Sequence, residues 1–413
     1  MSGTNGRIVV VGAGVAGVSA AGAARLAGYE GEIVLLGGED ALPYRRPTVS
    51  KELVRGDKGP DEVRIKPASW YEKNAIDLRT GVRAESVDPT AREVRLSDGS
   101  TLGYDQLLLA TGGRPRRLAA GDSGAVTLRE IGDADLLRER LDGRPDVVVV
   151  GAGLIGSEIA ASARQLGCDV TLLETAPLPM PRVLPADLGR MYADWHAAEG
   201  TELHADVRVR AIRPDADDPS LTVVEADDGR TWTAPVVVEA VGMTPDVELA
   251  RTVGVRLDDE LGGVQVDELG RTSVPDVFAA GDVASMPDLV RGGRHRVEHW
   301  QNAQNHGAAV GRAMAGVEKP FDEVPWCWSD QYGGTLQITG WPESSHTIVV
   351  RGDLDAHDFT AFYLDAEGIL LGAVGLGRPR EIRSARGWIG ERRRLDTTRL
   401  GDESVALEET LVS

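Results

Sequence analysis

The stretch VVVGAGLIGSEIA, Val148–Ala160, decides how this chain is built, because it nearly repeats the stretch VVVGAGVAGVSAA at Val9–Ala21. Each copy begins with a run of valines, continues with glycines in the pattern GxGxxG, and ends in small residues. A buried parallel strand, a tight turn and a helix are typical of such a pattern. The sequence therefore predicts the same strand, turn and helix unit twice in one α/β chain.

In the first copy, each glycine has a physical task. Gly12 permits the tight turn, Gly14 lets a pyrophosphate approach the backbone, and Gly17 lets the helix pack closely on the strand. The flanking residues predict a strand over Arg7–Val11 and a helix over Val18–Leu26. A phosphate would lie at the N-terminus of that helix.

The second copy repeats this arrangement with Gly151, Gly153 and Gly156, and predicts a helix over residues 157–166. Glu174 follows the next predicted strand. A carboxylate at this place accepts hydrogen bonds from a ribose 2′-hydroxyl, which favours NAD over its 2′-phosphorylated form. How strongly NADH is preferred to NADPH stays open.

Two Rossmann-like dinucleotide domains in one chain suggest that two dinucleotides exchange electrons, with a flavin facing a nicotinamide as the obvious pair. A duplicated scaffold with one inactive site is the alternative.

Composition limits the other possibilities. The chain has 413 residues and a net charge of −20, so a nucleic-acid backbone would be repelled by its average surface. Its two cysteines, Cys168 and Cys327, form no CxxC motif, which favours a reducing, cytoplasmic compartment. The uncharged stretch over residues 8–24 is too rich in glycine for a lipid-facing helix, so we expect no membrane contact.

Three further motifs carry a family resemblance. Residues 107–115, LLLATGGRP, and residues 236–249, VVVEAVGMTPDVEL, look like two crossings between an outer domain and an inserted one. Residues 271–284, RTSVPDVFAAGDVA, end in the pair Gly281-Asp282. At these residues the chain resembles the FAD-dependent pyridine nucleotide oxidoreductases. The resemblance implies that Asp282 contacts the flavin ribityl chain, although such a pair alone is more often only a turn.

The stretches LPYRRPTVSK (42–51), VEHWQNAQNHG (297–307) and VPWCWSDQY (324–332) narrow the resemblance to the ferredoxin reductases of bacterial oxygenase systems. The resemblance implies that Lys51 and Glu158 lie near flavin N5, where a cation stabilises the charge of a reduced flavin. It also implies that Trp328 lies beside the flavin on the electron exit path. The alternatives are a solvated lysine, an acid favoured by a helix dipole and a packed tryptophan.

The same resemblance supplies the remaining site residues. For FAD it gives Gly12, Gly14, Ala16, Gly17, Lys51, Ala84, Thr111, Gly112, Arg129, Gly281, Asp282 and Trp300. For NAD it gives Gly151, Gly153, Ile155, Gly156, Glu174 and Gly242. The chain departs from the family where an acid is usual for the FAD ribose, because Gly38 takes that place and Glu39 follows it. We predict Glu39 as the ribose ligand.

The predicted architecture has four parts: an FAD domain over residues 1–112 and 241–318, an inserted NAD domain over 113–240, and a C-terminal α+β domain over 319–413. The last part contains the alternating strands HTIVVRG and DFTAFYLD and a helix from Pro379, with Ile382, Ala385 and Ile389 as its buried stripe. Much of the local arginine set lies on the other face, and the predicted patch comprises Arg383, Arg386, Arg392, Arg393 and Arg394. Such a patch suits docking of an acidic ferredoxin, although a charge run is often only a solvated face.

The predicted function is an NADH-dependent ferredoxin reductase, active as a monomer or weak dimer. Hydride passes from NADH to N5 of FAD, and single electrons pass to a two-iron two-sulfur ferredoxin that serves a haem-thiolate or Rieske-type oxygenase. The alternatives are a disulfide or peroxide reductase, an NADH oxidase-like enzyme with another acceptor, and a non-catalytic redox sensor resembling apoptosis-inducing factor. The stretch HRVEH at residues 295–299 fits a zinc-peptidase pattern. It lacks the helical context, so no metal is predicted.

Overall fold

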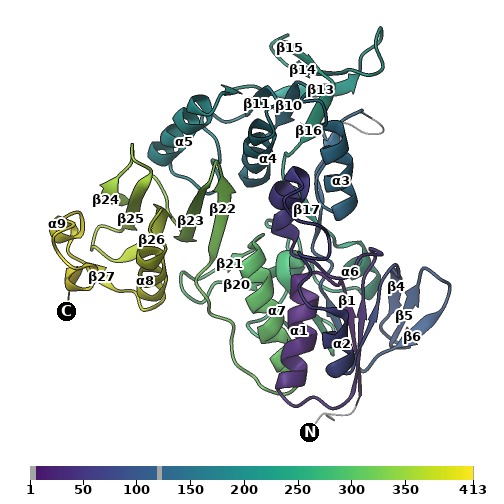
Figure 1. Ribbon diagram of the computed structural model, residues 1–413. Coiled ribbons are helices and arrows are strands. Elements are labelled where there is room, and N and C mark those ends of the chain that lie inside the picture. The colour runs from purple at the N-terminus through teal and green to yellow at the C-terminus, as the bar shows by residue number, and fades with distance from the viewer. Residues whose placement is uncertain (1–5, 119–122, 413) are drawn as a thin grey trace. The chain divides into compact units, whose positions relative to one another are not determined.

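The computed structural model describes residues 6–118 and 123–412, so residues 1–5, 119–122 and 413 of the predicted domains lie outside it. The described chain forms two compact units (Figure 1). Of the described residues, the first unit comprises 6–46, 59–114 and 243–323, and the second comprises 47–58, 115–118, 123–242 and 324–412. The short segment 47–58 thus groups with the second unit. The four predicted domain ranges stay a prediction.

A five-stranded parallel sheet forms the centre of the first unit, in the order β19-β7-β1-β2-β3. Strands of a parallel sheet are buried on both faces, which explains their nearly continuous apolar runs. The strands are β1 (Arg7–Val11), β2 (Glu32–Leu36), β3 (Ile76–Arg79), β7 (Gln106–Leu109) and β19 (Val277–Ala279). The predicted strand Arg7–Val11 is confirmed.

Two helices pack together on one face of this sheet, and Figure 1 shows them side by side: α1 (Val15–Leu26) and α7 (Trp300–Met314). Glycines allow this close approach. A Cβ atom added at Gly307 would lie 2.2 Å from the carbonyl oxygen of Ala16, and one at Gly311 would lie 2.1 Å from that of Ala20. The packing holds the first turn of α1 firmly against α7.

The other face is covered by the antiparallel sheet β4 (Ala84–Asp88), β5 (Glu93–Leu96) and β6 (Thr101–Gly103) and by α6 (Glu248–Val253). The first unit also contains α2 (Ala68–Lys73), β17 (Met243–Pro245), β18 (Val264–Gln265), β20 (Ala284–Pro287) and β21 (Arg294–His295).

The second unit repeats the parallel arrangement, with strand order β12-β11-β10-β16-β9. Its strands are β9 (Val126–Thr127), β10 (Val147–Val150), β11 (Val170–Leu173), β12 (Thr201–His204) and β16 (Val236–Glu239). The helices are α3 (Ile131–Arg140), α4 (Leu154–Gln165) and α5 (Ala186–Ala198). A small antiparallel sheet of β13 (Val209–Pro214), β14 (Thr222–Ala226) and β15 (Thr231–Ala234) shares a core with it. The predicted α/β class with two Rossmann-like sheets is confirmed.

Both predicted glycine-turn helices start too late. The sequence places their first residues at Val18 and Ser157, whereas α1 begins at Val15 and α4 at Leu154. The reason is that the middle glycine of each turn is itself the residue before the helix, in extended backbone. Each helix therefore opens directly onto its turn.

The C-terminal part of the second unit is an antiparallel sheet in the order β22-β23-β26-β25-β24. Its strands are β22 (Trp326–Gln331), β23 (Gly334–Gly340), β24 (Thr347–Asp353), β25 (Asp358–Leu364) and β26 (Leu370–Leu376). Helix α8 (Pro379–Gly390) buries the predicted stripe Ile382, Ala385 and Ile389 together with Trp388. Shorter elements follow: β27 (Arg394–Leu395), α9 (Thr397–Leu400) and β28 (Leu411–Val412).

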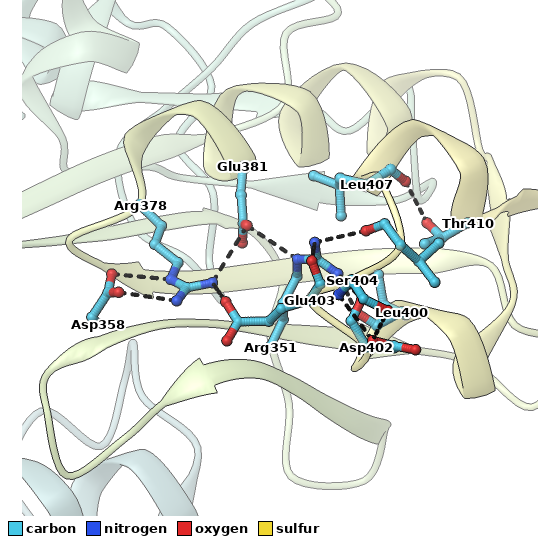
Figure 2. Close-up of polar contacts among 11 residues, drawn as sticks. Arg351, Asp358, Arg378, Glu381, Leu400, Asp402, Glu403, Ser404, Leu407 and Thr410 are labelled. Carbon is cyan, nitrogen blue, oxygen red and sulfur yellow. Dashed lines mark hydrogen bonds and ion pairs between the residues drawn. The ribbon is translucent and has the colours of Figure 1, made fainter.

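The buried Arg351 on β24 binds the segment 400–405 to this sheet. Figure 2 shows the Arg351 guanidinium facing Glu381 and the loop that follows α9. It donates to the carbonyl oxygens of Leu400, Asp402, Glu403 and Val405. Beside it, Arg378 binds Asp358, Glu381 and Glu403, which raise its pKa. Both guanidinium groups are thus committed to internal contacts.

Candidate functional site

The first glycine turn has the geometry of a dinucleotide cradle. Gly12 has a φ of 112°, and a Cβ atom there would lie 2.1 Å from the carbonyl oxygen of Ala110. At Gly17 a Cβ atom would lie 2.0 Å from the carbonyl oxygen of Gly12. A Cβ at Gly14, in contrast, would meet nothing within 4 Å. The turn is closed where the chain packs and open where a pyrophosphate would approach.

The N-terminus of α1 suits an anion. Its preceding residue, Gly14, provides no side-chain cap, and the first turn contains no acid. The backbone N–H groups of the first turn and the helix dipole therefore face the open side of Gly14 without a competing carboxylate. The residues present fit the pyrophosphate of FAD at this turn.

The second turn reproduces this geometry almost atom for atom. A Cβ atom at Gly151 would lie 2.5 Å from the carbonyl oxygen of Ala240, and one at Gly156 would lie 1.8 Å from that of Gly151. Gly153 is again open, with nothing within 4 Å of a Cβ. Ile155 is 45% exposed in the first turn of α4. The second turn thus fits a second dinucleotide.

Glu174 lies against the second turn, at the place predicted for a ribose. Its carboxylate accepts hydrogen bonds from the backbone N–H of Ala152 at 2.7 Å and of Ala176 at 2.9 Å. An ionised carboxylate has about four acceptor positions, so capacity remains for ribose hydroxyls. Gly242 follows β16 with a φ of 100°. The NAD role of both residues stays a proposal.

Glu39, the predicted FAD ribose ligand, already has partners. Its Oε1 lies 2.7 Å from Nη2 of Arg46, and its Oε2 accepts from the hydroxyl of Tyr44 at 2.6 Å. At Gly38, a Cβ atom would lie 3.0 Å from Cγ of Arg83, which is the residue before Ala84. The ion pair fixes the Glu39 side chain, and its contact with a ribose stays a prediction.

Several of the other predicted FAD residues converge beside the first turn. A Cβ at Gly281, where φ is 78°, would lie 2.9 Å from the Cβ of Ala16. Thr111 donates to the carbonyl oxygen of Asp246 at 2.7 Å, next to Gly112, whose φ is 66°. Trp300 begins α7. The first unit therefore gathers Gly12, Ala16, Gly281 and Asp282 at one place, whereas Lys51, Arg129 and Trp328 belong to the second unit.

The second unit brings Lys51 and Glu158 together. Lys51 lies in a short π-helical segment, Val49–Leu53, and Glu158 lies on α4. The Lys51 Nζ is 3.0 Å from Oε1 of Glu158, and the two side chains are only 5% and 6% exposed. The solvated-lysine alternative is therefore wrong, because this cation is buried and paired.

Two serines complete the environment of Glu158. Ser50 donates to its Oε2 at 2.5 Å, and Ser329 donates to its Oε1 at 2.8 Å. Burial raises the pKa of Glu158, whereas Lys51 and the two hydroxyls act in the opposite direction. The carboxylate thus has partners on both oxygens, as a buried charge requires. We call Lys51, Ser50, Glu158 and Ser329 the Lys51 cluster.

Trp328 lies on the same cluster from β22. The Nζ of Lys51 is 5.8 Å from its ring centroid, within the range of a cation–π contact. Trp326 stacks on the Trp328 ring, with ring centroids 5.2 Å apart and an angle of 26° between the planes. Half-buried, Trp328 is held by specific ring contacts.

Neither cysteine has the environment of a redox thiol. Cys168 and Cys327 are both buried and unpaired with each other. Burial raises the pKa of Cys327 to about 12 and also raises that of Cys168, so both stay protonated near neutral pH. Within residues 6–118 and 123–412, no group of three or more His, Cys, Asp or Glu side chains is arranged to hold a metal ion.

Two stretches of the chain, residues 6–307 and 326–411, match known protein families. The model of the pyridine nucleotide-disulphide oxidoreductases matches residues 6–307. The chain belongs to this family. A second model, described as the reductase C-terminal domain, matches residues 326–411.

Similarity to several known reductases extends over nearly the whole chain. It is 38% identical to the anthranilate 1,2-dioxygenase system ferredoxin–NAD(+) reductase component of Burkholderia cepacia, over 97% of this chain and 98% of that one. It is 36% identical to the p-cumate 2,3-dioxygenase system ferredoxin–NAD(+) reductase component of Pseudomonas putida, over 98% of each. The crystal structure of the covalent putidaredoxin reductase–putidaredoxin complex matches 98% of both chains, with 32% identity and a TM-score of 0.92.

Membership of the pyridine nucleotide-disulphide oxidoreductases confirms the predicted enzyme class, an FAD-dependent oxidoreductase, and the predicted cofactors FAD and NADH. The predicted resemblance to ferredoxin reductases is confirmed as well. Among the described residues, no helix is long and apolar enough to cross a membrane.

Sequence reasoning missed four polar residues of this family member: Ser50, Ser329, Asp330 and His306. The Nδ1 of His306 accepts from the backbone N–H of Gly281 at 3.3 Å, beside Asp282. Burial lowers the pKa of His306 to about 3, so its ring stays neutral and can accept. The signal for Ser329 and Asp330 was the polar run Ser329-Asp330-Gln331, which follows three apolar residues in β22. Ser50 had no comparable signal.

Proposed function

We propose that this chain is an NADH-dependent reductase of a two-iron two-sulfur ferredoxin that serves an oxygenase. The observation that carries the proposal is the pair of equivalent open turns at Gly14 and Gly153, together with two buried, isolated cysteines. Two dinucleotides can bind, and no dithiol is present to accept their electrons. An external one-electron acceptor fits this arrangement. The two relatives from dioxygenase systems are named as ferredoxin–NAD(+) reductase components.

The chain's own residues have distinct proposed roles. The first turn would hold FAD, and the chemistry that FAD would supply there is acceptance of a hydride from NADH and release of single electrons. Lys51 places a buried positive charge where we propose that the flavin N5 edge lies, and Glu158 keeps that ammonium oriented. Gly14 and Gly153 admit the two pyrophosphates, and Glu174 orients the NAD ribose. Trp328, packed on Lys51, forms the proposed exit for electrons.

An anaerobic absorbance titration of the FAD-loaded protein tests this function. Addition of NADH is expected to bleach the flavin, and a subsequent addition of oxidised two-iron ferredoxin is expected to restore its absorbance as the ferredoxin is reduced. Bleaching without transfer to the ferredoxin would reject the proposed acceptor and favour an oxidase or a redox sensor. A protein that cannot be loaded with FAD would reject the assignment of the first turn.

We further propose that an acidic ferredoxin docks on the exposed arginines near α8. Arg383, Arg392, Arg393 and Arg394 are exposed. Arg386 is half-buried and donates to the carbonyl oxygen of Val324, so its guanidinium supports the fold. Arg393 has a loose contact of 3.9 Å with Glu391. The exposed members form a local positive surface on a chain of net charge −20.

Charge reversal tests this docking surface. The double variant Arg383→Glu/Arg392→Glu is expected to raise the KM for ferredoxin about tenfold at low salt, because complementary charge steers association. Reduction of ferricyanide, which needs no docking, is expected to stay unchanged. Arg208→Glu is the control, since Arg208 is 75% exposed in the same unit and far along the chain. Equal KM values in the two variants would place the ferredoxin elsewhere.

Replacement of the buried thiol tests the rival dithiol chemistry. Cys327→Ser is expected to retain ferredoxin reduction within about twofold per bound flavin, because a thiol with a raised pKa is a poor nucleophile. Cys168→Ser is the matched control, since Cys168 is also buried. Loss of turnover in Cys327→Ser alone, with normal flavin content, would support thiol chemistry and contradict the proposal.

A further inference from the structure

Asp330 contacts the Lys51 cluster but is no part of the predicted site. Its Oδ2 lies 3.4 Å from the Nζ of Lys51 and accepts a hydrogen bond from the indole N–H of Trp328 at 3.1 Å. Its Oδ1 accepts from the hydroxyl of Thr335 at 2.7 Å. A single carboxylate thus joins the cation and the ring that are both proposed to face the flavin.

The strand geometry explains why Asp330 can do this. Trp328 and Asp330 are two residues apart on β22, so their side chains leave the same face of the sheet. Thr335 is the direct cross-strand partner of Asp330 on β23 and holds one carboxylate oxygen. The other oxygen is thereby aimed at Trp328 and Lys51. β22 is an edge strand, which lets Lys51 reach both Asp330 on this face and Glu158 beside Ser329.

The two carboxylates that face Lys51 differ in exposure. Glu158 is 6% exposed, whereas the Asp330 side chain is 42% exposed. Glu158 is fixed by two serines inside the unit, while Asp330 keeps contact with water. Asp330 therefore adds a negative charge beside the ammonium without the desolvation cost that Glu158 bears. That charge offsets part of the field of the cation.

We propose that Asp330 is a positioning residue for electron transfer, which holds Trp328 and Lys51 in one arrangement and lowers the reduction potential of the bound flavin. This inference rests on the proposed function, because that function places Lys51 beside the flavin. A reduced flavin carries negative charge, and Lys51 stabilises it. A carboxylate 3.4 Å from Lys51 weakens this stabilisation and makes the reduced flavin a stronger donor.

The test is the midpoint potential of the FAD-loaded protein, measured by anaerobic titration against a reference dye. The variants Asp330→Asn and Asp330→Ala remove the charge, and both are expected to shift the potential in the positive direction. The expected size is about a tenfold change in the equilibrium constant for two-electron reduction, or about 30 mV. Asp330→Glu retains the charge and is expected to stay within a third of that shift.

Asp194→Asn is the matched control, because Asp194 is an exposed acid on α5 in the same unit. It removes the same charge from the protein without touching Lys51. If Asp330→Asn and Asp330→Ala have the potential of Asp194→Asn, or a more negative one, the inference is overturned. Two uncharged variants are used so that the loss of flavin from one still leaves a decisive measurement.

Orientation of Trp328 gives a second readout. Asn can still accept from the indole N–H of Trp328, whereas Ala cannot. Ferredoxin reduction is therefore expected to be about tenfold slower in Asp330→Ala than in Asp330→Asn, with flavin reduction by NADH similar in both. Equal ferredoxin rates would reject the positioning of Trp328. Failure of the wild-type protein to reduce ferredoxin, with the potential shifts intact, would reject the proposed function and leave the effect of Asp330 on the flavin standing.

Discussion

Replacing Lys51 with methionine is expected to slow the reduction of bound FAD by NADH by about two orders of magnitude. The substitution removes a cation that is 5% exposed and lies 3.0 Å from Glu158. Lys51 opposes the effect of burial on Glu158, so its loss raises the pKa of this carboxyl further. The site then presents no positive charge to the reduced flavin. Anaerobic stopped-flow absorbance at saturating NADH measures the rate.

Lys58→Met is the control for this prediction. Lys58 lies in the same short segment, 47–58, and pairs with Glu52 at 3.0 Å, but its side chain is 37% exposed. Its loss is expected to change the rate by less than about twofold, as for an exposed ion pair. The double variant Lys51→Met/Glu158→Gln is expected to be little slower than Lys51→Met alone, because the two residues act as one unit. Equal rates in Lys51→Met and Lys58→Met would remove Lys51 from the mechanism.

Substitution of Gly12 by alanine is expected to weaken FAD binding by at least about a hundredfold, so that the protein is purified nearly without flavin. The new methyl group would lie 2.1 Å from a backbone oxygen, in a residue with a φ of 112°. Both the clash and the unfavourable backbone region act on the turn that receives the pyrophosphate. Flavin content after purification and fluorescence titration with FAD measure the effect.

Two matched variants make the assignment of the turns testable. Gly28→Ala has the same kind of backbone strain, with a φ of 89°, but a Cβ there meets nothing within 4 Å, so FAD is expected to stay bound. Gly151→Ala places a methyl group 2.5 Å from the carbonyl oxygen of Ala240 in the second turn. It is expected to retain FAD and to raise the KM for NADH. The opposite outcome, with FAD lost only from Gly151→Ala, would exchange the two cofactors between the turns.

The local elements could be predicted closely from the sequence, because their signals lie within a few residues. The strand Arg7–Val11 has the predicted bounds, and the buried stripe of α8 is the predicted one. The two predicted helix starts were wrong by three residues each. The residue before each helix is a glycine, which has no capping side chain to mark the boundary in the sequence. Such boundaries depend on backbone geometry more than on composition.

Sequence periodicity could not reveal the hydrogen-bond partners of Glu158, because they are distant in the chain. Ser50 is 108 residues away in the chain, and Ser329 is 171 residues away. The family resemblance indicated Lys51 and Glu158. The serines that donate hydrogen bonds to Glu158 had no such indication, apart from three consecutive polar residues in β22. Likewise, the sequence does not distinguish the arginines of the predicted patch from one another. Only the tertiary structure shows that Arg386 donates to the carbonyl oxygen of Val324.

The sequence by itself determined the two glycine turns and the parallel sheets that carry them, because turns and apolar strands are encoded by neighbouring residues. Its resemblance to a known family gave the enzyme class. The tertiary structure alone decided that Lys51 is buried and paired, that Glu158 has two serine donors, and that Asp330 joins Lys51 to Trp328. The physical reason is that a buried charge needs partners on all sides, and only folding brings them from distant parts of the chain.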